Sequence, residues 1–440
     1  MASLRPKGRW PVWGLSVMNR VVITGMGVLA PNAHGLEALE RALRDGVSGI
    51  RFIDAMAENK LACQVAGVPE NVDALKGDYL TDEDLMAMNQ SMIYTAIAGI
   101  DCWRDARMAE PGSEVDWDTG AIIGTGVGGM DTIAEKLVPK VNAGRVRRLG
   151  STLVEQVMAS SISAKLGGIL GLGGQVTTNS SACTTGTEAV VDAFLHIREG
   201  RAKRMLAGGA EAASHFIWAG FDAMRVLNRK SNDAPEKASR PMSASAAGFV
   251  PGSGAGILML ESLSSAKERG ARIYAEVLGG HVNSGGHRGG GSMTAPNPEG
   301  VIRCIRAALT MANIAPTEVD AINGHLTATF ADPKEIDNWQ TALGLPAEEF
   351  PLINSTKSMI GHALGAAGGL ECVATALQLH SGFLHGSLNC EDLHPEIERI
   401  EKSVLRETRP FNGRVIAKSS FGFGDVNGCV VFRKWDNAAS

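Results

Sequence analysis

Short runs of apolar and β-branched residues recur along the chain, and each of them predicts a buried strand. Alanine-rich stretches with helical character separate many of these runs. Such an alternation of strands and helices is typical of a layered α/β fold with buried sheets. The expected strands are Val21–Thr24, Ala121–Ile123, Gly256–Leu260, Ile273–Val277, Val415–Ala417 and Cys429–Phe432.

Two segments predict helices that are apolar on most of their faces. Thr187–Glu199 follows Cys183, Leu364–His380 follows His362, and a glycine closes each segment. A helix that is apolar all round belongs in the interior of a protein. Two buried helices, each preceded by a reactive residue type, favour two similar halves that meet at one site. The alternative is that any large α/β protein contains buried helices.

Composition narrows the class of protein. Apolar residues make up 44% of the 440 residues, which is enough for a large core and excludes global disorder. The chain has 42 Lys and Arg against 47 Asp and Glu, a net charge of −5. This mild acidity argues against nucleic acid as a partner, because no basic excess exists to release counterions. No apolar run approaches the ~20 residues that span a bilayer, so no membrane insertion is expected.

Cysteine usage and the N-terminus predict a cytoplasmic location. The seven cysteines are scattered, odd in number and never in a C-x-x-C pair, which is typical of a reducing compartment. Residues 1–17 contain neither a continuous apolar segment nor a cleavage site, so no signal peptide is expected. Met18 is an alternative start. The sequence leaves open whether the extension of residues 1–17, which we expect to be frayed and disordered, belongs to the native protein.

Two glycine-rich segments lack the features of nucleotide-binding loops. Residues 279–291 combine dense glycine with few aliphatic anchors, which predicts a mobile loop. Residues 124–129 follow an expected strand and are the better dinucleotide candidate. However, no strand that ends in Asp or Glu follows at the distance needed to hold a ribose. We therefore expect no nucleotide cofactor.

Cys183 is the strongest candidate nucleophile. It lies among the small residues of segment 179–186, which opens an expected buried helix. The positive end of a helix lowers the pKa of a thiol and favours the thiolate. The alternative is that a free cysteine is most often buried and inert, and the other six cysteines fit that description.

Two histidines stand in unusual sequence surroundings. His325 lies in segment 323–329 and His362 ends segment 355–362. A metal site of His325, Asp332 and Glu335 is conceivable, but no tight ligand spacing supports it, and no metal is expected. A lone histidine is more often structural or exposed than catalytic, and we interpret six others in this way: His34, His196, His215, His380, His385 and His394.

Motifs spread along nearly the whole chain carry a family resemblance. They are Gly25–Gly27, the block around Cys183, Ala207–Glu211, Ser239–Pro241, Gly248–Val250, the block around His325, Ser355–Ser358 with Gly361 and His362, and Phe421–Gly424. From about Met18 to Lys434 the chain resembles the β-ketoacyl-[acyl-carrier-protein] synthases of the decarboxylating type I/II. The Cys-Gly pair that thiolases use as a base in the second half is not matched. The resemblance implies a thiolase-like α/β fold with five α-β-α-β-α layers, built from halves at residues 18–268 and 269–440.

The resemblance also implies a catalytic mechanism. Cys183 would take up an acyl chain from a carrier protein as an enzyme thioester. His325 and His362 would be neutral, and their Nε2–H groups would stabilise the enolate left when malonyl-carrier protein loses CO₂. Lys357 and Glu371 match the supporting charged pair of the family. No cofactor is implied, because the phosphopantetheine arm arrives on the carrier protein.

Further residues match positions that hold the substrate. Backbone N–H groups of Cys183 and Phe423 would form the oxyanion hole, and Phe423 would gate the pocket. Thr327 and Thr329 would bind the pantetheine amides. Val127 would limit acyl chain length at the pocket floor, with a volume that suits medium to long chains. Phe421 would also line the substrate site.

The chain departs from the family pattern at the gate. Asp425 and Val426 replace the usual Gly-Thr, and Leu326 and Ala328 replace a common Gly and Ser. The glycine-rich segment 279–291 lacks an Asp that relatives often carry. We hypothesise that Asp425 supplies a gate contact that is made differently elsewhere, and that it retunes which acyl chains are admitted.

The partners expected from the resemblance are an acidic acyl carrier protein and a second copy of the chain. Among the basic clusters, relatives favour Arg147, Arg148 and Arg229 as docking residues. The expected function is elongation in fatty acid biosynthesis. The alternatives are a ketosynthase of a polyketide or aryl-polyene pathway, a non-catalytic chain-length partner, and a coenzyme A-dependent enzyme. The presence of Cys183 with both histidines argues against the non-catalytic partner.

Overall fold

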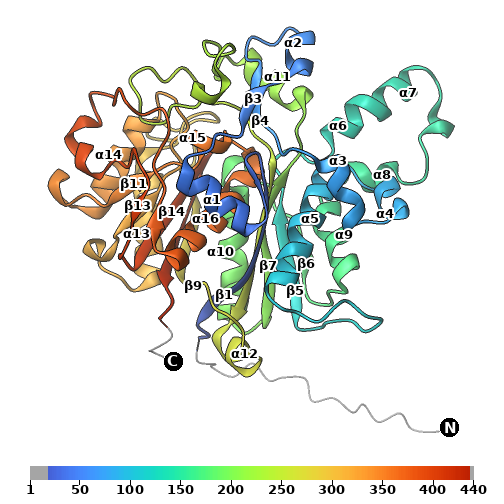
Figure 1. Cartoon of the computed structure of the whole chain (residues 1–440), viewed down its shortest axis with the longest axis horizontal. Helices are drawn as coiled ribbons and strands as arrows, with labels where there is room; N and C mark the ends of the chain where they lie inside the picture. Colours follow the sequence, from blue (N-terminus) through green and yellow to red (C-terminus); the bar gives the residue numbers. More distant parts are fainter. Residues whose placement is uncertain (1–17, 437–440) are drawn as a thin grey trace.

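The structure is a computed structural model that describes residues 18–436 of the chain, built around one mixed sheet (Figure 1). The strands follow the order β11-β10-β14-β15-β9-β1-β8-β7-β5-β6, and the short β2 (Ala33–His34) pairs with β1. Each strand expected from the sequence overlaps one of these strands. Their bounds are β1 Val21–Ala30, β5 Thr119–Gly124, β6 Val176–Thr177, β7 Arg204–Glu211, β8 Gly254–Ser262, β9 Ala275–Ser284, β10 Ala321–Asn323, β11 Leu352–Asn354, β14 Val415–Gly422 and β15 Val426–Lys434.

Each half of the chain repeats the same strand arrangement. The order β1-β8-β7-β5-β6 of the first half is matched by β9-β15-β14-β10-β11 in the second. Along each of these orders, the first two pairs of neighbouring strands are antiparallel and the last two pairs are parallel. The halves join where β1 pairs with β9, in the register Val21 to Val277. The expected duplication is therefore present in the backbone itself.

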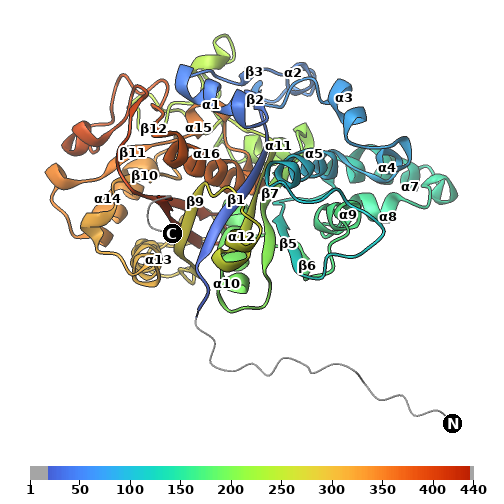
Figure 2. The same ribbon diagram turned by 60° about the horizontal axis from the view of Figure 1, so that its bottom comes forward.

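Helices complete the layers around these strands. The expected buried helices are α10 (Thr185–Arg198) and α16 (Ala367–Ser381), which pack on each other and on strands of both halves. The outer helices are α5 (Gln90–Asp105) and α9 (Ser161–Leu170) on one side, and α13 (Pro298–Ala312) and α14 (Asp332–Leu343) on the other (Figure 2). This arrangement confirms the expected α/β fold with a thiolase-like, five-layered architecture.

The remaining elements connect and cap these layers. The helices are α1 Leu36–Asp45, α2 Asp54–Glu58, α3 Val72–Leu75, α4 Asp82–Ala87, α6 Met130–Thr132, α7 Val138–Asn142, α8 Leu153–Val157, α11 His215–Ala223, α12 Leu263–Glu268 and α15 Lys357–Ile360. Small two-stranded sheets form from β3 (Ile50–Phe52) with β4 (Val65–Gly67), and from β12 (Phe383–Leu384) with β13 (Arg409–Pro410).

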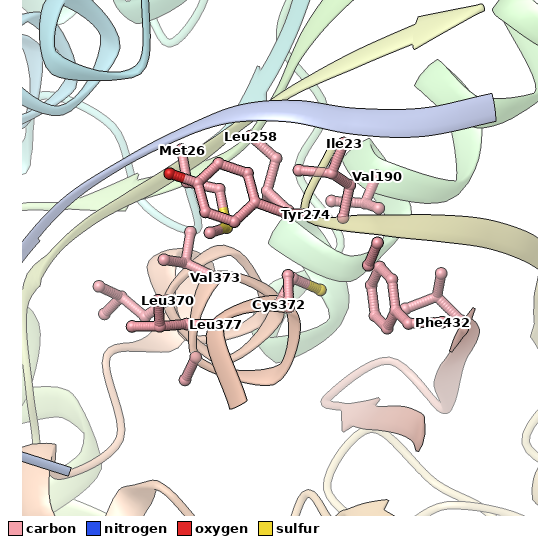
Figure 3. Packing of buried hydrophobic residues seen from close by; sticks show 14 of the residues in the cluster. Ile23, Met26, Val190, Leu258, Tyr274, Leu370, Cys372, Val373, Leu377 and Phe432 are labelled. Carbon is pink, nitrogen blue, oxygen red and sulfur yellow. The ribbon is translucent and has the colours of Figure 1, made fainter. Parts of the chain in front are cut away.

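The central core lies where α10 and α16 meet the two sets of strands (Figure 3). Ile23 and Leu258 of the first half, Val190 of α10, Val373 of α16 and Phe432 of the second half are all at most 1% exposed. Full burial of each such side chain contributes roughly 1.5–3 kcal/mol before chain entropy is counted. This core fixes the ends of α10 and α16, and those ends carry the candidate catalytic residues.

The glycine-rich segment 279–291 differs from its expected form. Its first part belongs to β9, which runs to Ser284, and only the residues that follow form a loop. A Cβ at Gly279 would lie 2.6 Å from the backbone nitrogen of Ala312 in α13. Glycine here lets a helix pack closely on the strand, a purpose that local composition does not distinguish from loop flexibility.

The expected extension at residues 1–17 lies outside the described residues. Among the helices that the structure describes, none has both the length and the apolar character needed to cross a bilayer.

Candidate active site

Three reactive side chains from distant parts of the sequence meet at the centre of the molecule. Cys183 lies at the start of α10, His325 follows β10, and His362 follows α15. The Cys183 Sγ atom is 3.0 Å from His362 Nε2. The two imidazole rings are 5.2 Å apart between centroids and nearly perpendicular. The structure thus brings together the three residues that the sequence singled out.

Unusual backbone geometry accompanies each of the three residues. Ala182, Ala328 and Leu364 have φ values of 50°, 63° and 48°, in the left-handed region that residues other than glycine rarely adopt. Each lies within three residues of a reactive side chain. Such strain persists only where surrounding contacts fix it, and it is typical of functional sites.

Hydrogen bonding defines the tautomer of His362. Its Nδ1 atom accepts the backbone N–H of Leu364 at 3.3 Å, so the proton of the neutral ring lies on Nε2. That N–H points at Cys183 Sγ. His325 is also buried, and its Nδ1 atom has no hydrogen-bond partner among the described residues.

Both imidazoles are held neutral. Burial, followed by the positive charge of Lys357, lowers the pKa of His325 and of His362 well below the ordinary value of 6.5. Lys418 acts on both rings in the same direction. Two neutral imidazoles therefore lie beside the thiol, each with a ring nitrogen within 4.8 Å of the sulfur.

The expected thiolate at Cys183 is wrong for the resting site. Burial raises the pKa of the thiol to about 11, although the charge of Lys357 and a hydrogen bond from the Phe423 backbone N–H act in the opposite direction. Helix position alone suggested a lowered pKa, but Cys183 is only 9% exposed, and burial is the largest influence on its pKa. The resting thiol is therefore protonated at neutral pH.

The backbone around Cys183 forms a close junction with the β14–β15 turn. The Phe423 N–H bonds to the thiol, and a Cβ at Gly422 would lie 3.0 Å from the Cys183 backbone nitrogen. Any side chain larger than glycine would press on that N–H group. The backbones of Cys183 and Phe423, whose N–H groups are expected to form an oxyanion hole, thus lie next to each other.

Lys357 and Glu371 form a buried ion pair, and a second lysine joins them. Lys357 Nζ contacts one oxygen of Glu371, and Lys418 Nζ lies 2.8 Å from the other. All three side chains are at most 2% exposed. Lys357 and Glu371 were expected from the sequence, whereas Lys418 was not. The missed signal was a lysine at an inward-facing position of an apolar strand.

A cavity of about 910 Å³ opens onto the reactive residues. Its wall includes Thr327, Thr329, Phe421 and Phe423 together with the three reactive side chains. The two threonine hydroxyls are 3.0 Å apart, and the Phe423 ring packs 6.0 Å from that of Phe221 on α11. A cavity of this size and mixed lining is typical of a small-molecule or cofactor-arm site.

Two expected substrate residues lie elsewhere. Val127 is 39% exposed and does not line the cavity of the described chain. Asp425 is fully buried, and its carboxylate accepts the backbone N–H groups of Asn297 and His287 at 2.7 and 2.9 Å. The Asp425 carboxylate thus holds a loop and does not line the cavity, because its two oxygens accept backbone N–H groups of that loop.

Buried carboxylates hold the catalytic loops by their backbones. Glu335, at the start of α14, accepts the N–H groups of His325 and Leu326, both at 2.7 Å. Asp332 accepts those of Thr327 and Ala328 at 2.9 and 3.1 Å. The conceivable metal site of His325, Asp332 and Glu335 is thus replaced by a cradle for the histidine loop.

Glu211 performs the same task on the opposite side of the site. Its carboxylate accepts Thr125 Oγ1 at 3.0 Å, Gly126 N–H at 2.8 Å and Gly365 N–H at 3.0 Å. Burial raises its pKa to about 7. The loop that bears Val127 is therefore tied to the loop that follows His362. The Glu211 carboxylate was missed as a functional group, although its motif was recognised.

Sulfur and ring nitrogen atoms of Cys183, His325 and His362 all lie within 4.8 Å of one another. Soft donors at this spacing resemble a transition-metal site. However, the His362 N–H already faces the sulfur, which makes the group a donor–acceptor pair. We keep the prediction that catalysis uses no metal.

The expected docking residues are dispersed over the surface. Arg147 and Arg148 lie on an exposed single turn, Val146–Arg148, in the α6–α8 region. Arg229 lies in the loop after α11, with its guanidinium paired to Asp222 at 3.8 Å. Arg147 and Arg148 therefore lie on one segment of the chain and Arg229 on another.

Two basic residues that were not favoured lie at the cavity itself. Arg225, after α11, and Lys334, in the first turn of α14, both line its wall. Exposed Phe330 lies beneath the Lys334 ammonium, which is 5.5 Å from the ring centroid. The sequence signal for Lys334 was weak, because a single lysine in a helix is ordinarily solvated surface.

Comparison with known proteins places the chain in a family. Its residues 18–266 match the model of the beta-ketoacyl synthase N-terminal domain, and residues 274–391 match that of the C-terminal domain. The chain therefore belongs to the beta-ketoacyl synthase family, and it is an acyltransferase. The resemblance noted in the sequence is confirmed.

Individual relatives agree with this assignment. The chain is 36% identical over 420 residues to 3-oxoacyl-[acyl-carrier-protein] synthase 2 of Vibrio harveyi, covering 94% of this chain and 98% of that protein. A beta-ketoacyl synthase from Burkholderia phymatum superposes with a TM-score of 0.88 at 28% identity. The superposition covers 95% of this chain and 100% of that chain. A type II polyketide synthase ketosynthase, solved with its acyl carrier protein and a bound hexaketide, has a TM-score of 0.84 at 27% identity, over 95% of this chain and 100% of that chain.

Proposed function

We propose that this protein is a β-ketoacyl-[acyl-carrier-protein] synthase that elongates acyl chains by two carbons in fatty acid biosynthesis. One observation carries the proposal: a thiol and two neutral imidazoles converge on one cavity. Cys183 supplies the nucleophile, and His325 and His362 supply the donors. The 36% identity to a 3-oxoacyl-[acyl-carrier-protein] synthase supports this choice of substrate.

The first half-reaction transfers an acyl chain to the enzyme. The Cys183 sulfur attacks the thioester carbonyl of an acyl-carrier protein, and the oxyanion is stabilised by the N–H groups of Cys183 and Phe423. The thioester bond of the carrier breaks as the new one forms. The thiol proton leaves with the phosphopantetheine sulfur. Because the resting thiol is protonated, deprotonation accompanies attack rather than preceding it.

The second half-reaction joins the chains. Malonyl-carrier protein places its thioester oxygen against the Nε2–H groups of His325 and His362. The bond to the carboxylate breaks, CO₂ leaves, and the electron pair remains as an enolate. The enolate carbon attacks the acyl-Cys183 carbonyl, and collapse of that intermediate expels the Cys183 sulfur, which takes up a proton from solvent. A neutral imidazole polarises the enolate oxygen without surrendering its own proton.

Phosphopantetheine is the only prosthetic arm this reaction requires, and the carrier protein brings it. The Thr327 and Thr329 hydroxyls line the cavity and suit the amides of such an arm. We therefore propose that the enzyme has no cofactor of its own and works in the cytoplasm.

The leading alternative is a ketosynthase of a dedicated polyketide or aryl-polyene pathway. The structural likeness to a polyketide ketosynthase favours it, although identity there is 27% against 36% for the fatty acid relative. An assay with malonyl-carrier protein and a panel of primers separates the two. Robust extension of saturated C4–C16 primers supports fatty acid elongation, whereas extension of only aryl or polyene primers supports the alternative. Turnover with coenzyme A thioesters alone would contradict both.

We propose that the acidic carrier protein docks at the cavity mouth, against Arg225 and Lys334, with Arg147, Arg148 and Arg229 as further contacts. Reversal of the first two charges, Arg225→Glu with Lys334→Glu, is expected to raise the KM for acyl-carrier protein by about tenfold with a smaller change in kcat. Steady-state kinetics at low and high salt measure this. Lys267→Glu, on α12 far from the mouth, is the matched control. An unchanged KM in the double variant would show that the carrier docks elsewhere.

Asp425 is expected to set chain preference through the loop it holds. Its two carboxylate oxygens and its backbone carbonyl bind loop residues His287, Asn297 and Gly285, and the loop lines the cavity beside Phe423. In Asp425→Asn an amide N–H₂ replaces one acceptor and faces a backbone donor, which loosens the loop. We expect the ratio of long-chain to short-chain extension rates to change several-fold, both here and in Asp425→Gly.

The control for this prediction is Arg288→Ala. Arg288 lies in the same loop, but its guanidinium bonds only to carbonyls of that loop. The primer panel is run with all three variants. Chain preference that is the same in both Asp425 variants and the wild type would refute the gate hypothesis.

We also propose a homodimer. The main sheet ends at β6, which pairs only with β5 in the described chain, and an open edge strand can pair with a second copy. Val127 is exposed although family resemblance assigns it to the pocket floor, and a partner surface would enclose it. Exposed apolar side chains nearby in sequence support such an interface, namely Val138, Val141, Val146, Val154 and Met158.

A further inference from the structure

Lys418 occupies a position where burial of a charged side chain costs free energy. It lies on β14 between Ile416 and Ser420, on the strand face that looks toward α10 and α16, and it is fully buried. The alternate residues of the strand face the core of the second half. A lysine is almost never fully buried unless it is paired, so its contacts define its purpose.

The contacts of Lys418 converge on the catalytic ion pair. Its ammonium lies 2.8 Å from Glu371 Oε2 and donates to Ser420 Oγ at 2.9 Å and to the Ser419 carbonyl. Lys357 occupies the other oxygen of the same carboxylate. Two ammonium groups thus share one carboxylate in a site closed to solvent.

Other groups around Lys357, Lys418 and Glu371 do not cancel the excess positive charge of these three side chains. Cys372 on α16 and Cys429 on β15 face Lys418 as buried thiols, and burial raises the pKa of each to about 12. Glu335 on α14 is reached through Ser419 Oγ at 3.2 Å, but its oxygens are occupied by the backbone N–H groups of the His325 loop. Burial raises the pKa of Glu335 to about 7, so its own charge is incomplete at neutral pH.

We propose that Lys418 is a positioning residue that adds a second positive charge to the buried Lys357–Glu371 pair and so favours the neutral rings of His325 and His362. The proposal rests on the proposed function, because it is the enolate that needs neutral donors. An imidazolium would transfer its proton to the enolate carbon, giving acetyl-carrier protein and destroying the nucleophile. Protonation of His362 would also break the bond from Leu364 N–H to Nδ1.

Electrostatics gives the direction of the effect. The charge of Lys418 contributes to the lowered pKa of both imidazoles. Removing a positive charge raises those pKa values, so the activity that needs neutral rings is lost at a higher pH on the acid side. In a site of low dielectric constant we expect a shift of about 0.5–1 pH unit.

The test uses enzyme already acylated on Cys183, so that thiol deprotonation does not enter. Single-turnover extension by malonyl-carrier protein is followed from pH 5 to 8 for the wild type, Lys418→Met and Lys418→Gln. Both substitutions remove the charge, but only glutamine can still bond to Ser419 and Ser420. We expect both acid limbs to move up by about 0.5–1 unit, with rates that do not change with pH above pH 7.5 and more acetyl-carrier protein at pH 6.

Several results would overturn the proposal. A uniform loss of rate at every pH with an unmoved acid limb would mean that Lys418 only supports the fold. Each variant leaves Lys357 and Glu371 as a pair of one positive and one negative charge. The melting temperatures of both variants should therefore equal or exceed that of the wild type. Failure of both variants to fold would contradict an excess positive charge in the wild-type site. Lys434→Met, on the neighbouring strand, is the control. A wild type that forms no β-ketoacyl product at any pH would instead refute the proposed function.

Discussion

Replacement of Cys183 by alanine is expected to reduce condensation by more than about 1,000-fold, because no other described group can hold the acyl chain beside the two histidines. The variant should still decarboxylate malonyl-carrier protein. The Nε2–H donors that stabilise the enolate are retained, since the Nδ1 atom of His362 remains held by the Leu364 backbone. Acetyl-carrier protein should therefore accumulate in place of the elongated product.

This prediction is checked by separating carrier-protein products by mass spectrometry. Cys304→Ala is a matched control, because this buried cysteine on α13 lies outside the cavity lining and should leave condensation intact. Full condensation by Cys183→Ala would exclude the covalent mechanism. Loss of decarboxylation together with condensation, in a folded variant, would mean that the thiol itself activates malonyl-carrier protein.

His325→Ala and His362→Ala are each expected to slow decarboxylation by about 100–1,000-fold, the usual cost of removing one donor to a developing oxyanion. The two variants should differ in the first half-reaction. His362 donates to Cys183 Sγ at 3.0 Å, whereas no hydrogen bond links His325 to the sulfur in the described structure. Acylation of Cys183 should therefore be preserved in His325→Ala and impaired in His362→Ala.

Two measurements separate these effects. Rapid-quench measurement of malonyl-carrier protein consumption gives the rate of decarboxylation. The intact mass of the enzyme after incubation with acyl-carrier protein gives the rate of acylation. The internal control is His394→Ala, a histidine that was assigned a structural role. Equal loss of acylation in both catalytic variants would contradict the division of labour. So would decarboxylation at the wild-type rate in either of them.

Much of the architecture could be predicted because its signals are local. The apolar runs around Val21 and Val430 and the buried helices after Cys183 and His362 correspond to β1, β15, α10 and α16. The duplication followed from two apolar helices, each with a reactive residue at its start. Only the layering required information from the resemblance, since periodicity alone does not say which strands are neighbours.

Three features could not be read locally, because each depends on what tertiary packing places around a residue. The pKa of Cys183 is raised because the thiol is buried, whereas its place before a helix had suggested a lowered pKa. Asp425 follows the gate, yet its carboxylate turns away from the cavity to hold Asn297 and His287. Lys418 matters only because Glu371, distant in sequence, meets it across the central layer.

The most direct test of the central claim is a pulse and chase on the enzyme itself. The protein is incubated with an acyl-carrier protein, its intact mass is recorded, and ¹³C-malonyl-carrier protein is then added. We predict one acyl adduct that maps to Cys183, followed by its loss as a labelled β-ketoacyl-carrier protein two carbons longer appears at the same rate. An elongated product that forms without an adduct, or an adduct that the malonyl substrate does not discharge, would contradict covalent catalysis by Cys183 with the His325–His362 pair.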